Sequence, residues 1–283
     1  MAVLLVETAS YIVYRSSPGN PSRRSRLLYP IMFSSIFLWS FLGTSFVVCS
    51  LFLDMYEWQP LRVVRFVLGS SLTASIGIAA LLSLIAQRYA FPKRLGGMVA
   101  GSFSGSSVGE AFLDLCRKMS VRGVDLRRAT VGNAFSLSNR GWKVVAVSQE
   151  LIESMSSAEA EAVMAHELAH LKNNDSREKG LSRVAKLAFA FDPVLHLTEA
   201  AVHRERELLA DQSSIGYTQK PLALASALLK VHSSFRAGPP GPGAGLFRGY
   251  KAKGLLSKYP DLDRRVELLI DMARKMRLHT ISA

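Results

Sequence analysis

Acidic residues and cysteines are scarce in this chain of 283 residues. Only 22 residues are Asp or Glu against 35 that are Lys or Arg, so the formal net charge is +13. The two cysteines lie in dissimilar surroundings, Cys49 inside an apolar run and Cys116 in a helical pattern. Their scarcity and placement argue against a disulfide and fit a reducing compartment.

Nucleic-acid motifs and internal repeats are also missing. A basic chain can bind nucleic acid, anionic lipid or acidic partners, but here much of the positive charge flanks apolar segments, as Arg88, Lys93 and Arg94 do. We therefore expect a lipid bilayer as partner and no nucleic acid. The composition, with 49% apolar and 20% charged residues, excludes both a disordered chain and one that lies wholly in a membrane.

Two long stretches without a charged side chain predict a transmembrane hairpin. They cover residues 27–53 and 66–87, which are 27 and 22 residues long. A helix needs about 20 apolar residues to cross a bilayer, and a backbone in lipid has to satisfy its own hydrogen bonds. We therefore expect two membrane-spanning helices within residues 27–90, joined by a short turn over residues 54–65, rather than a pair of buried core helices.

Basic residues around these stretches predict the orientation. Both outer flanks are basic, with Arg15, Arg23, Arg24 and Arg26 on one side and Arg88, Lys93 and Arg94 on the other. Because cytoplasmic flanks carry an excess of Lys and Arg, both termini and everything after about residue 91 are expected in the cytoplasm. The predicted location is the cell membrane, multi-pass, with the larger domain on the cytoplasmic face.

The segments before and after the hairpin differ in composition. Residues 1–26 start with an apolar stretch that is short for a span and lacks the pattern of a signal peptide, so we expect an interfacial or docked helix. Residues 91–109 are rich in Gly and Ser and predict a flexible connector. Residues 110–283 then form the remaining domain.

This last domain is predicted to be α+β and mainly helical, with a small β-sheet. Residues 121–128 and 143–148 have strand patterns, and residues 139–141 between them give a turn signal. Ser156 and Glu159 have the spacing of a capping box, which predicts the start of a helix. Other helices are expected at about residues 110–121, 176–190, 194–215, 221–234 and 262–277.

The capped helix carries the sequence His166-Glu167-Leu168-Ala169-His170. Two histidines four residues apart lie on one helical face, so both imidazoles can reach one metal ion. Glu167 lies beside them and can take a proton from a zinc-bound water. The alternative, two surface histidines on an ordinary helix, is disfavoured by the strand and the helix cap that precede the motif.

A catalytic zinc site needs a third protein ligand and an open position. His203, Glu207 and Asp211 share one helical face at steps of four residues, and each is a candidate. A Glu ligand with an Asp one turn later that holds a ligand histidine is a chemically sensible arrangement. The alternative is a solvated charged face on a surface helix.

Several motifs in order resemble the HtpX and CAAX-prenyl-protease group of membrane metallopeptidases. The resemblance covers about residues 120–272 and is carried by Asn133-Ala134-Phe135, the strand around residues 144–147, residues 164–173, Arg206-Glu207-Leu208-Leu209-Ala210-Asp211, and Tyr259-Pro260 with Arg265-Val266. It implies a zincin-like domain with one Zn²⁺ per chain on His166, His170 and Glu207, Glu167 as general base and Asp211 behind a ligand. It also implies that Asn133, Ala134 and Phe135, with their strand, bind protein or peptide substrates.

The chain departs from this group in two places. Members usually have a second membrane hairpin between the histidine pair and the Glu ligand, but here 36 residues separate His170 from Glu207. That short connection resembles the metalloprotease module of antirepressor-type sensors. Tyr259 stands where the group usually has His, so the residue that polarises the substrate carbonyl stays open among His203, His232, Tyr250, Tyr259 and Arg265.

Three functions compete at this stage. The leading hypothesis is a membrane-anchored zinc endopeptidase that cleaves membrane or misfolded proteins at the cytoplasmic face, in protein quality control. The second is a sensor-type protease that cleaves one regulator. The third, a non-catalytic membrane adaptor, predicts a missing ligand or base, whereas His166, Glu167, His170 and Glu207 are all present. The sequence does not indicate an oligomeric state.

Overall fold

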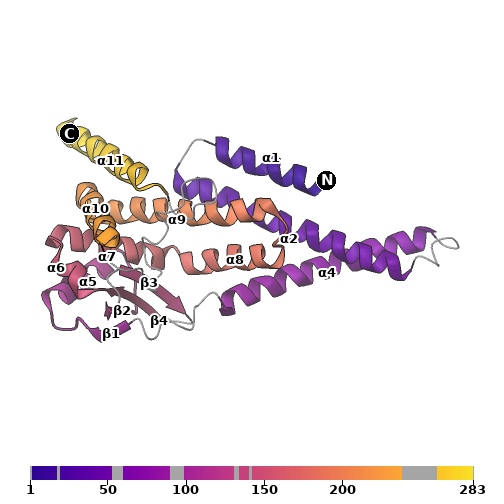
Figure 1. Cartoon of the computed structure of the whole chain (residues 1–283), viewed down its shortest axis with the longest axis horizontal. Coiled ribbons are helices and arrows are strands. Elements are labelled where there is room, and N and C mark those ends of the chain that lie inside the picture. The colour runs from indigo at the N-terminus through magenta and orange to yellow at the C-terminus, as the bar shows by residue number, and fades with distance from the viewer. Residues whose placement is uncertain are drawn as a thin grey trace. The chain divides into compact units, whose positions relative to one another are not determined.

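In the computed structural model the chain forms two compact units, each assembled from separate stretches of sequence (Figure 1). The helical unit contains Met1–Ala90 and Arg177–Val202, and the mixed unit contains Phe91–Ser176 and His203–Ala283. The structure describes residues 2–17, 20–52, 60–89, 99–130, 134–139, 142–237 and 260–282. Residues 177–202, which we expected in the C-terminal domain, group with the N-terminal helices.

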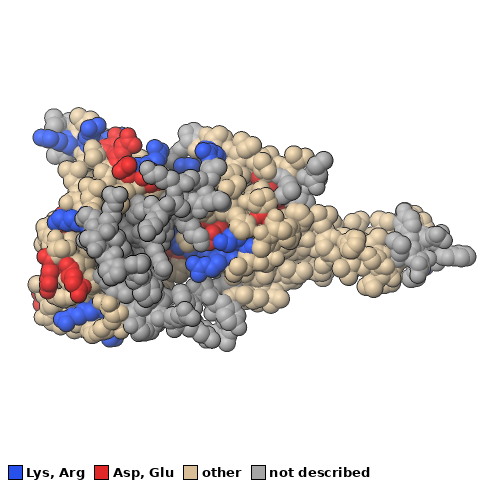
Figure 2. Space-filling model, in the orientation of Figure 1, with Lys and Arg blue, Asp and Glu red and all other residues tan. Residues whose placement is uncertain are grey.

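Two long helices form a hairpin in the helical unit. They are α2 (Pro21–Leu51) and α4 (Pro60–Tyr89), which pack along each other. Thr44 Oγ1 donates a hydrogen bond to the Ser71 carbonyl oxygen at 3.4 Å between them. Both helices are long and apolar enough to cross a membrane, and much of the surface of their hairpin in Figure 2 is free of charged side chains. The prediction of two long apolar helices is confirmed.

The start of the second helix differs from the expected turn. Residues 60–65 of that turn are helical, so Arg62 and Arg65 lie in the first turns of α4. Proline is favoured at the first position of a helix because its missing N–H would have no intrahelical partner there, which suits Pro60. Residues 53–59 of the expected turn lie outside the described residues.

The N-terminal stretch is a helix that docks within the helical unit. It forms α1 (Ala2–Ser16), and its Tyr11 and Tyr14 are buried in a cluster with Leu28 of α2 and Val194. Arg24 lies over the ring of Tyr14, 5.1 Å from its centroid. The helix is therefore held by apolar packing and a cation–π contact.

A four-stranded sheet forms one layer of the mixed unit. Its strands are β1 (Val99–Ser102), β2 (Val124–Ala129), β3 (Ala134–Asn139) and β4 (Trp142–Val147), in the order β1-β2-β4-β3. β2 and β4 are parallel, and the other two pairs are antiparallel. β3 therefore lies at one edge of the sheet, next to the central strand β4.

Helices cover the sheet and complete the main core. α5 (Ser107–Lys118) and α7 (Ser157–Lys172) pack against each other and against strands. Val145 and Val147 of β4 are buried with Leu168 of α7 in this core. The remaining helices are α6 (Gln149–Glu153), α8 (Asp175–Ala188), α9 (Pro193–Thr218), α10 (Pro221–Ala237) and α11 (Leu262–Ser282).

The expected connector is partly structured. Residues 99–102 of the 91–109 segment form β1, and Ser106 caps α5 by accepting a hydrogen bond from the Gly109 amide at 3.1 Å. Gly109 has no room for a side chain, because a Cβ there would lie 2.5 Å from the Phe103 carbonyl oxygen. Its glycine therefore serves close packing rather than flexibility. The predicted class, mainly helical α+β with a small sheet and two apolar N-terminal helices, is confirmed.

Candidate metal centre

Helix α7 presents two imidazoles to a common point. It begins with a complete capping box, in which the Glu159 amide donates to Ser156 Oγ at 3.3 Å and the Ser156 amide donates to Glu159 at 2.7 Å. His166 and His170 are buried, and their Nε2 atoms lie 3.1 Å apart. The helical repeat therefore aims one nitrogen of each ring at the same position.

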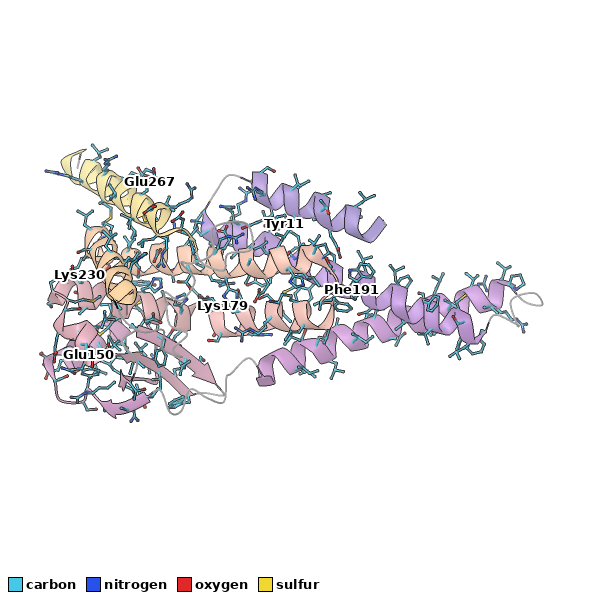
Figure 3. The ribbon with its side chains drawn as sticks, in the orientation of Figure 1. Tyr11, Glu150, Lys179, Phe191, Lys230 and Glu267 are labelled. Carbon is cyan, nitrogen blue, oxygen red and sulfur yellow. The ribbon has the colours of Figure 1, made fainter. Side chains whose placement is uncertain are left out.

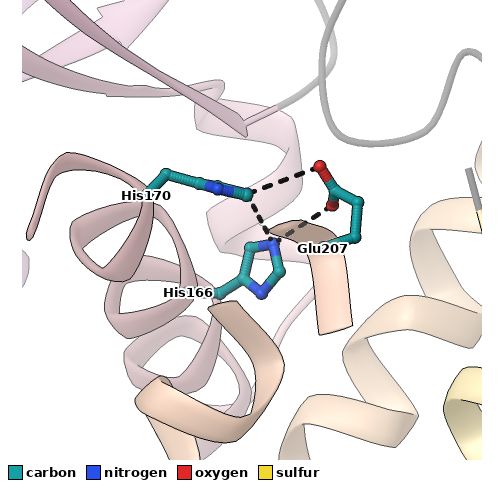
Figure 4. Close-up of side chains that lie close together, drawn as sticks. All are labelled: His166, His170 and Glu207. Atoms are coloured by element: carbon teal, nitrogen blue, oxygen red, sulfur yellow. Dashed lines mark hydrogen bonds and ion pairs between the residues drawn. The ribbon is translucent and has the colours of Figure 1, made fainter. Parts of the chain in front are cut away.

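Helix α9 supplies a carboxylate to the same position. Glu207 Oε2 lies 3.6 Å from His166 Nε2, and Glu207 Oε1 lies 3.6 Å from His170 Nε2 (Figure 4). Glu207 is 3% exposed, and one donor atom from each of the three residues lies within 4.8 Å of the others. Two imidazoles and one buried carboxylate thus converge from two helices.

The three donors fit a zinc ion. In a tetrahedral zinc site the donors are about 2.0–2.2 Å from the metal, which puts neighbouring donors about 3.3–3.6 Å apart. The separations of 3.1, 3.6 and 3.6 Å are close to this range. Two imidazoles with one carboxylate are a donor set of catalytic zinc sites, which leave a fourth position for water or substrate.

Glu167 lies next to the first histidine and is not part of this donor set. Its side chain is 1% exposed, and Oε1 has no hydrogen-bond partner among the described residues. A buried polar oxygen without a partner is costly unless a ligand or water satisfies it. This placement suits a carboxylate that accepts a proton from a water molecule in the site.

Each histidine is held from behind by an acid and an arginine. Asp211 Oδ1, one turn after Glu207 on α9, lies 2.9 Å from His166 Nδ1. Arg265 of α11 donates to both oxygens of Asp211, from Nε at 2.7 Å and from Nη2 at 2.6 Å. A carboxylate on the second ring nitrogen fixes the orientation of a ligand histidine and raises its basicity.

His170 has a similar arrangement with different residues. Asp175 Oδ2, in the first turn of α8, lies 2.5 Å from His170 Nδ1, and Arg206 Nη1 donates to Asp175 Oδ1 at 3.2 Å. Asp175 and Arg206 are 2% and 5% exposed. Although Arg206 belongs to a motif of the resemblance, its pairing with Asp175 was not predicted, because an Arg next to a Glu on a helix gives no local sign of a distant partner.

Burial and charge act in opposite directions on these groups. Burial tends to raise the pKa of Asp211, but the positive charge of Arg265 and the contact with His166 outweigh it, so the pKa is lowered. Burial lowers the pKa of Arg206 to about 10, which still leaves the guanidinium charged at neutral pH. Arg265 therefore favours the ionised form of Asp211, and Arg206 places a positive charge beside Asp175.

Other predicted site residues are placed differently. Ala134 and Phe135 lie at the start of the edge strand β3, and both side chains are buried, so these two residues would offer a substrate their backbone rather than their side chains. Asn133 lies outside the described residues. β3 packs beside α7, the helix that carries both histidines.

The candidates for polarising a carbonyl are narrowed. Arg265 is 0% exposed and donates hydrogen bonds to Asp211 behind His166. It is therefore not open to a substrate carbonyl, which was one of the possibilities that the sequence left. His203 is buried and His232 is half-buried. Tyr250 and Tyr259 lie outside the described residues.

Comparisons with known proteins find similarity to two kinds of peptidase. Residues 137–246 match the family described as BlaR1 peptidase M56. A "Protease HtpX homolog" of Methanopyrus kandleri is 29% identical over 185 residues, which cover 51% of this chain and 58% of the relative. One of Pyrococcus abyssi is 30% identical over 189 residues, which cover 52% of this chain and 65% of the relative. The chain thus spans less than two thirds of the length of these relatives.

One solved structure shows a weaker likeness. Ste24p of S. mikatae aligns with 85% of this chain and 65% of its own, at 14% identity and a TM-score of 0.42. This score is too low to establish a common fold. The resemblance to HtpX that the motifs predicted is confirmed by the sequence relatives.

Proposed function

From this HtpX-like sequence, we propose that the chain is a membrane-anchored zinc endopeptidase that cleaves membrane or misfolded proteins at the cytoplasmic face. The observation that carries the proposal is the convergence of His166, His170 and Glu207 within 4.8 Å, with the buried Glu167 beside them. The resemblance to proteins named as HtpX proteases supports it.

The residues of the site divide the chemistry among them. Zinc, when bound, would lower the pKa of a coordinated water towards neutrality and polarise a peptide carbonyl. His166, His170 and Glu207 would hold the ion, and Asp211 and Asp175 keep the two imidazoles oriented through their Nδ1 atoms. Glu167 would take the proton of the attacking water and return it to the leaving nitrogen.

The edge strand β3 is the proposed place for the substrate. An extended peptide can add to an exposed sheet edge through backbone hydrogen bonds, which give affinity with little dependence on sequence. β3 pairs with β4 on one side, and the structure shows no strand on its other side among the described residues. Its position beside α7 would bring a bound peptide towards the histidines.

The membrane anchor is proposed to be the hairpin of α2 and α4. Its two helices meet the length and composition of membrane spans. The basic flanks, which include Arg23, Arg24 and Arg26 in the first turns of α2, support cytoplasmic ends. The substrates nearest to such an enzyme are proteins in or at the same membrane.

A single carboxylate substitution tests the proposal. In Glu167→Gln the ligands are untouched, so zinc content should equal that of the wild type, while casein cleavage should fall by about 10²–10⁴-fold or more because the base is lost. Glu161→Gln on the same helix is the matched control, since Glu161 pairs with Lys220 rather than with the site. Activity of Glu167→Gln near the wild-type level, or wild-type activity that a chelator leaves intact, would refute the proposal.

A second candidate is a regulatory protease that cleaves one specific protein. The match of residues 137–246 to the BlaR1 peptidase family and the short connection between His170 and Glu207 favour it. A proteome comparison between cells with the wild type and cells with Glu167→Gln separates the two. One accumulating protein would favour the regulatory enzyme, and many accumulating membrane proteins would favour quality control.

A further inference from the structure

The turn between α8 and α9 presents an apolar surface in the helical unit. Leu187 and Phe191 are 67% and 66% exposed. The other exposed residues of the segment 187–193, which we call the α8–α9 tip, are Ala188, Ala190 and Pro193. Five exposed apolar residues in seven positions, with no exposed polar one, are unusual for a turn in water, where loops are mostly polar.

Asp192 in the tip and His196 after it have hydrogen-bond partners inside the protein. Asp192 is 0% exposed, accepts a hydrogen bond from Trp39 Nε1 at 3.0 Å, and caps α9 by accepting from the Val194 amide at 2.8 Å. His196 Nε2 lies 2.8 Å from the carbonyl oxygen of Ala190. Internal pairing of every polar group is what hydrocarbon demands of a segment that enters it.

Lys186 and Glu199, which flank the tip in sequence, form an ion pair with each other. Lys186 Nζ lies 3.2 Å from Glu199 Oε2, and Glu199 is only 2% exposed. The pair links α8 to α9 and gives the half-buried Lys186 a buried acidic partner. An ion pair of this kind lowers the cost of placing the two charges near a layer of low dielectric constant.

The tip packs on the middle of the proposed membrane hairpin. Phe191 stacks edge-on against Trp39 of α2, with ring centroids 4.8 Å apart. Phe189 and Leu82 of α4 both pack against a buried cluster that includes Ile36 of α2. Trp39 is 12 residues after Leu27, where the charge-free run starts, which is about 18 Å along a helix. A hydrocarbon core is about 30 Å thick, so Trp39 would lie well inside it.

The basic residues of α8 lie in the part of the helix before the α8–α9 tip. Arg177 and Arg183 are exposed, and Lys179 is half-buried, all of them earlier in α8 than Leu187. Figure 3 labels Lys179 near the start of α8 and Phe191 in the turn after its other end. Basic residues at the level of lipid headgroups, followed by apolar residues deeper in, are typical of segments that penetrate a membrane surface. The charges favour lipid over a protein partner.

We propose that the α8–α9 tip is a re-entrant membrane element, in which Leu187 and Phe191 contact lipid acyl chains beside α2. The proposal rests on the membrane hairpin of the proposed function. The tip enters the bilayer and returns on the same side, because Asp192 and Pro193 interrupt an apolar stretch too short for two spans. The chain would thus be held by three membrane-contacting elements instead of two.

Spin labels on single cysteines test this in the full chain reconstituted into liposomes. The background is Cys49→Ala, while Cys116 can stay because burial raises the pKa of its thiol to about 11, which suppresses its reaction with the label. Labels are placed at Leu187→Cys and Phe191→Cys. The controls are Ile76→Cys in α4, 59% exposed, for lipid, and Leu222→Cys in α10, 58% exposed, for water.

Collision with oxygen, which concentrates in lipid, is compared with collision with a water-soluble nickel complex. The proposal predicts that labels at positions 187 and 191 shift the oxygen-to-nickel ratio towards that of Ile76→Cys. If they match Leu222→Cys while Ile76→Cys reports lipid, the re-entrant tip is wrong and the hairpin stands. If Ile76→Cys also reports water, both proposals fail. A label at position 191 that collides rarely with both reagents and shows spin–spin broadening would overturn the re-entrant tip. It would show instead that a second copy of the chain covers this surface.

Discussion

The two units treat polar and apolar side chains in opposite ways. In the mixed unit the buried polar residues gather at one site, where Glu207, Asp211 and Arg265 are 3%, 4% and 0% exposed. In the helical unit many large apolar residues are exposed, and Phe46 and Leu51 of α2 are both 75% exposed. Apolar surface of this kind is expensive in water and costs nothing in lipid. The contrast indicates that one chain is built for two solvents.

The largest expected difference between the two units is their response to a lysine placed on an exposed apolar position. Ile76 and Leu113 have similar exposed fractions, 59% and 53%, but lie in the helical and mixed units. We expect Ile76→Lys to oppose membrane insertion by about 2.5–3.5 kcal/mol, and Leu113→Lys to change stability by about 0.5 kcal/mol at most. The measurement is the fraction of each variant that resists extraction from membranes with alkaline carbonate. Equal retention of both would show that the exposed apolar surface of α4 does not face lipid.

Removal of a charge behind a ligand should act on the site alone. Asp211→Asn and Asp175→Asn each remove the carboxylate that orients one ligand imidazole through its Nδ1 atom. Zinc affinity should therefore fall by about 10–100-fold in each variant. The loss should be larger for Asp211→Asn, because the fully buried Arg265 then loses the carboxylate that accepts two of its hydrogen bonds. Competition with a chelator measures the affinity, and Asp114→Asn at an exposed pair with Arg117 is the control. Unchanged affinity in both variants would contradict a supporting role for these acids.

The smallest expected effect concerns the cap of α7 and its pH dependence. Burial tends to raise the pKa of Glu159, but hydrogen bonds from Lys230, Ser226 and Ser156 outweigh it and lower the pKa to about 2. A lowered pKa stabilises the folded state above the ordinary value of 4.5, and this contribution is lost as the pH falls towards 2. Glu159→Gln should therefore destabilise the fold by about 1–3 kcal/mol at pH 7 and by less at pH 3.

Apparent melting temperatures at the two pH values check this prediction. The exposed Glu150, in the neighbouring helix α6, provides the control variant Glu150→Gln. A destabilisation that stays constant between pH 7 and pH 3 would show that the charge of Glu159 does not hold the helix start. Because α7 carries both ligand histidines, this cap connects a local sequence signal to the position of the site.

Local patterns were enough to predict most of the helices. The capping box at Ser156 and Glu159 placed the start of α7, and Asn173 ends it. The spacing of His166 and His170 predicted a shared face, and steps of four predicted the face of Glu207 and Asp211. These features depend on neighbours within one or two helical turns, so the local sequence is enough to predict them.

Features that depend on distant contacts were not predictable. Arg265 lies 54 positions after Asp211, and no periodic pattern connects them. Strand β1 falls in a Gly/Ser-rich segment and exists because β2 is available for pairing. The grouping of residues 177–202 with the N-terminal helices is likewise a tertiary effect, which propensity and spacing do not encode.

The most direct measurement is the metal content of the purified full chain beside that of Glu207→Ala, with Glu205→Ala, on the same helix, as the control. If two imidazoles and one carboxylate grip the ion, the wild type should contain one zinc per chain. Glu207→Ala should lose nearly all of it after dialysis, and Glu205→Ala should keep it. A wild type without zinc, or a Glu207→Ala variant that retains one zinc per chain, would contradict a centre built from His166, His170 and Glu207.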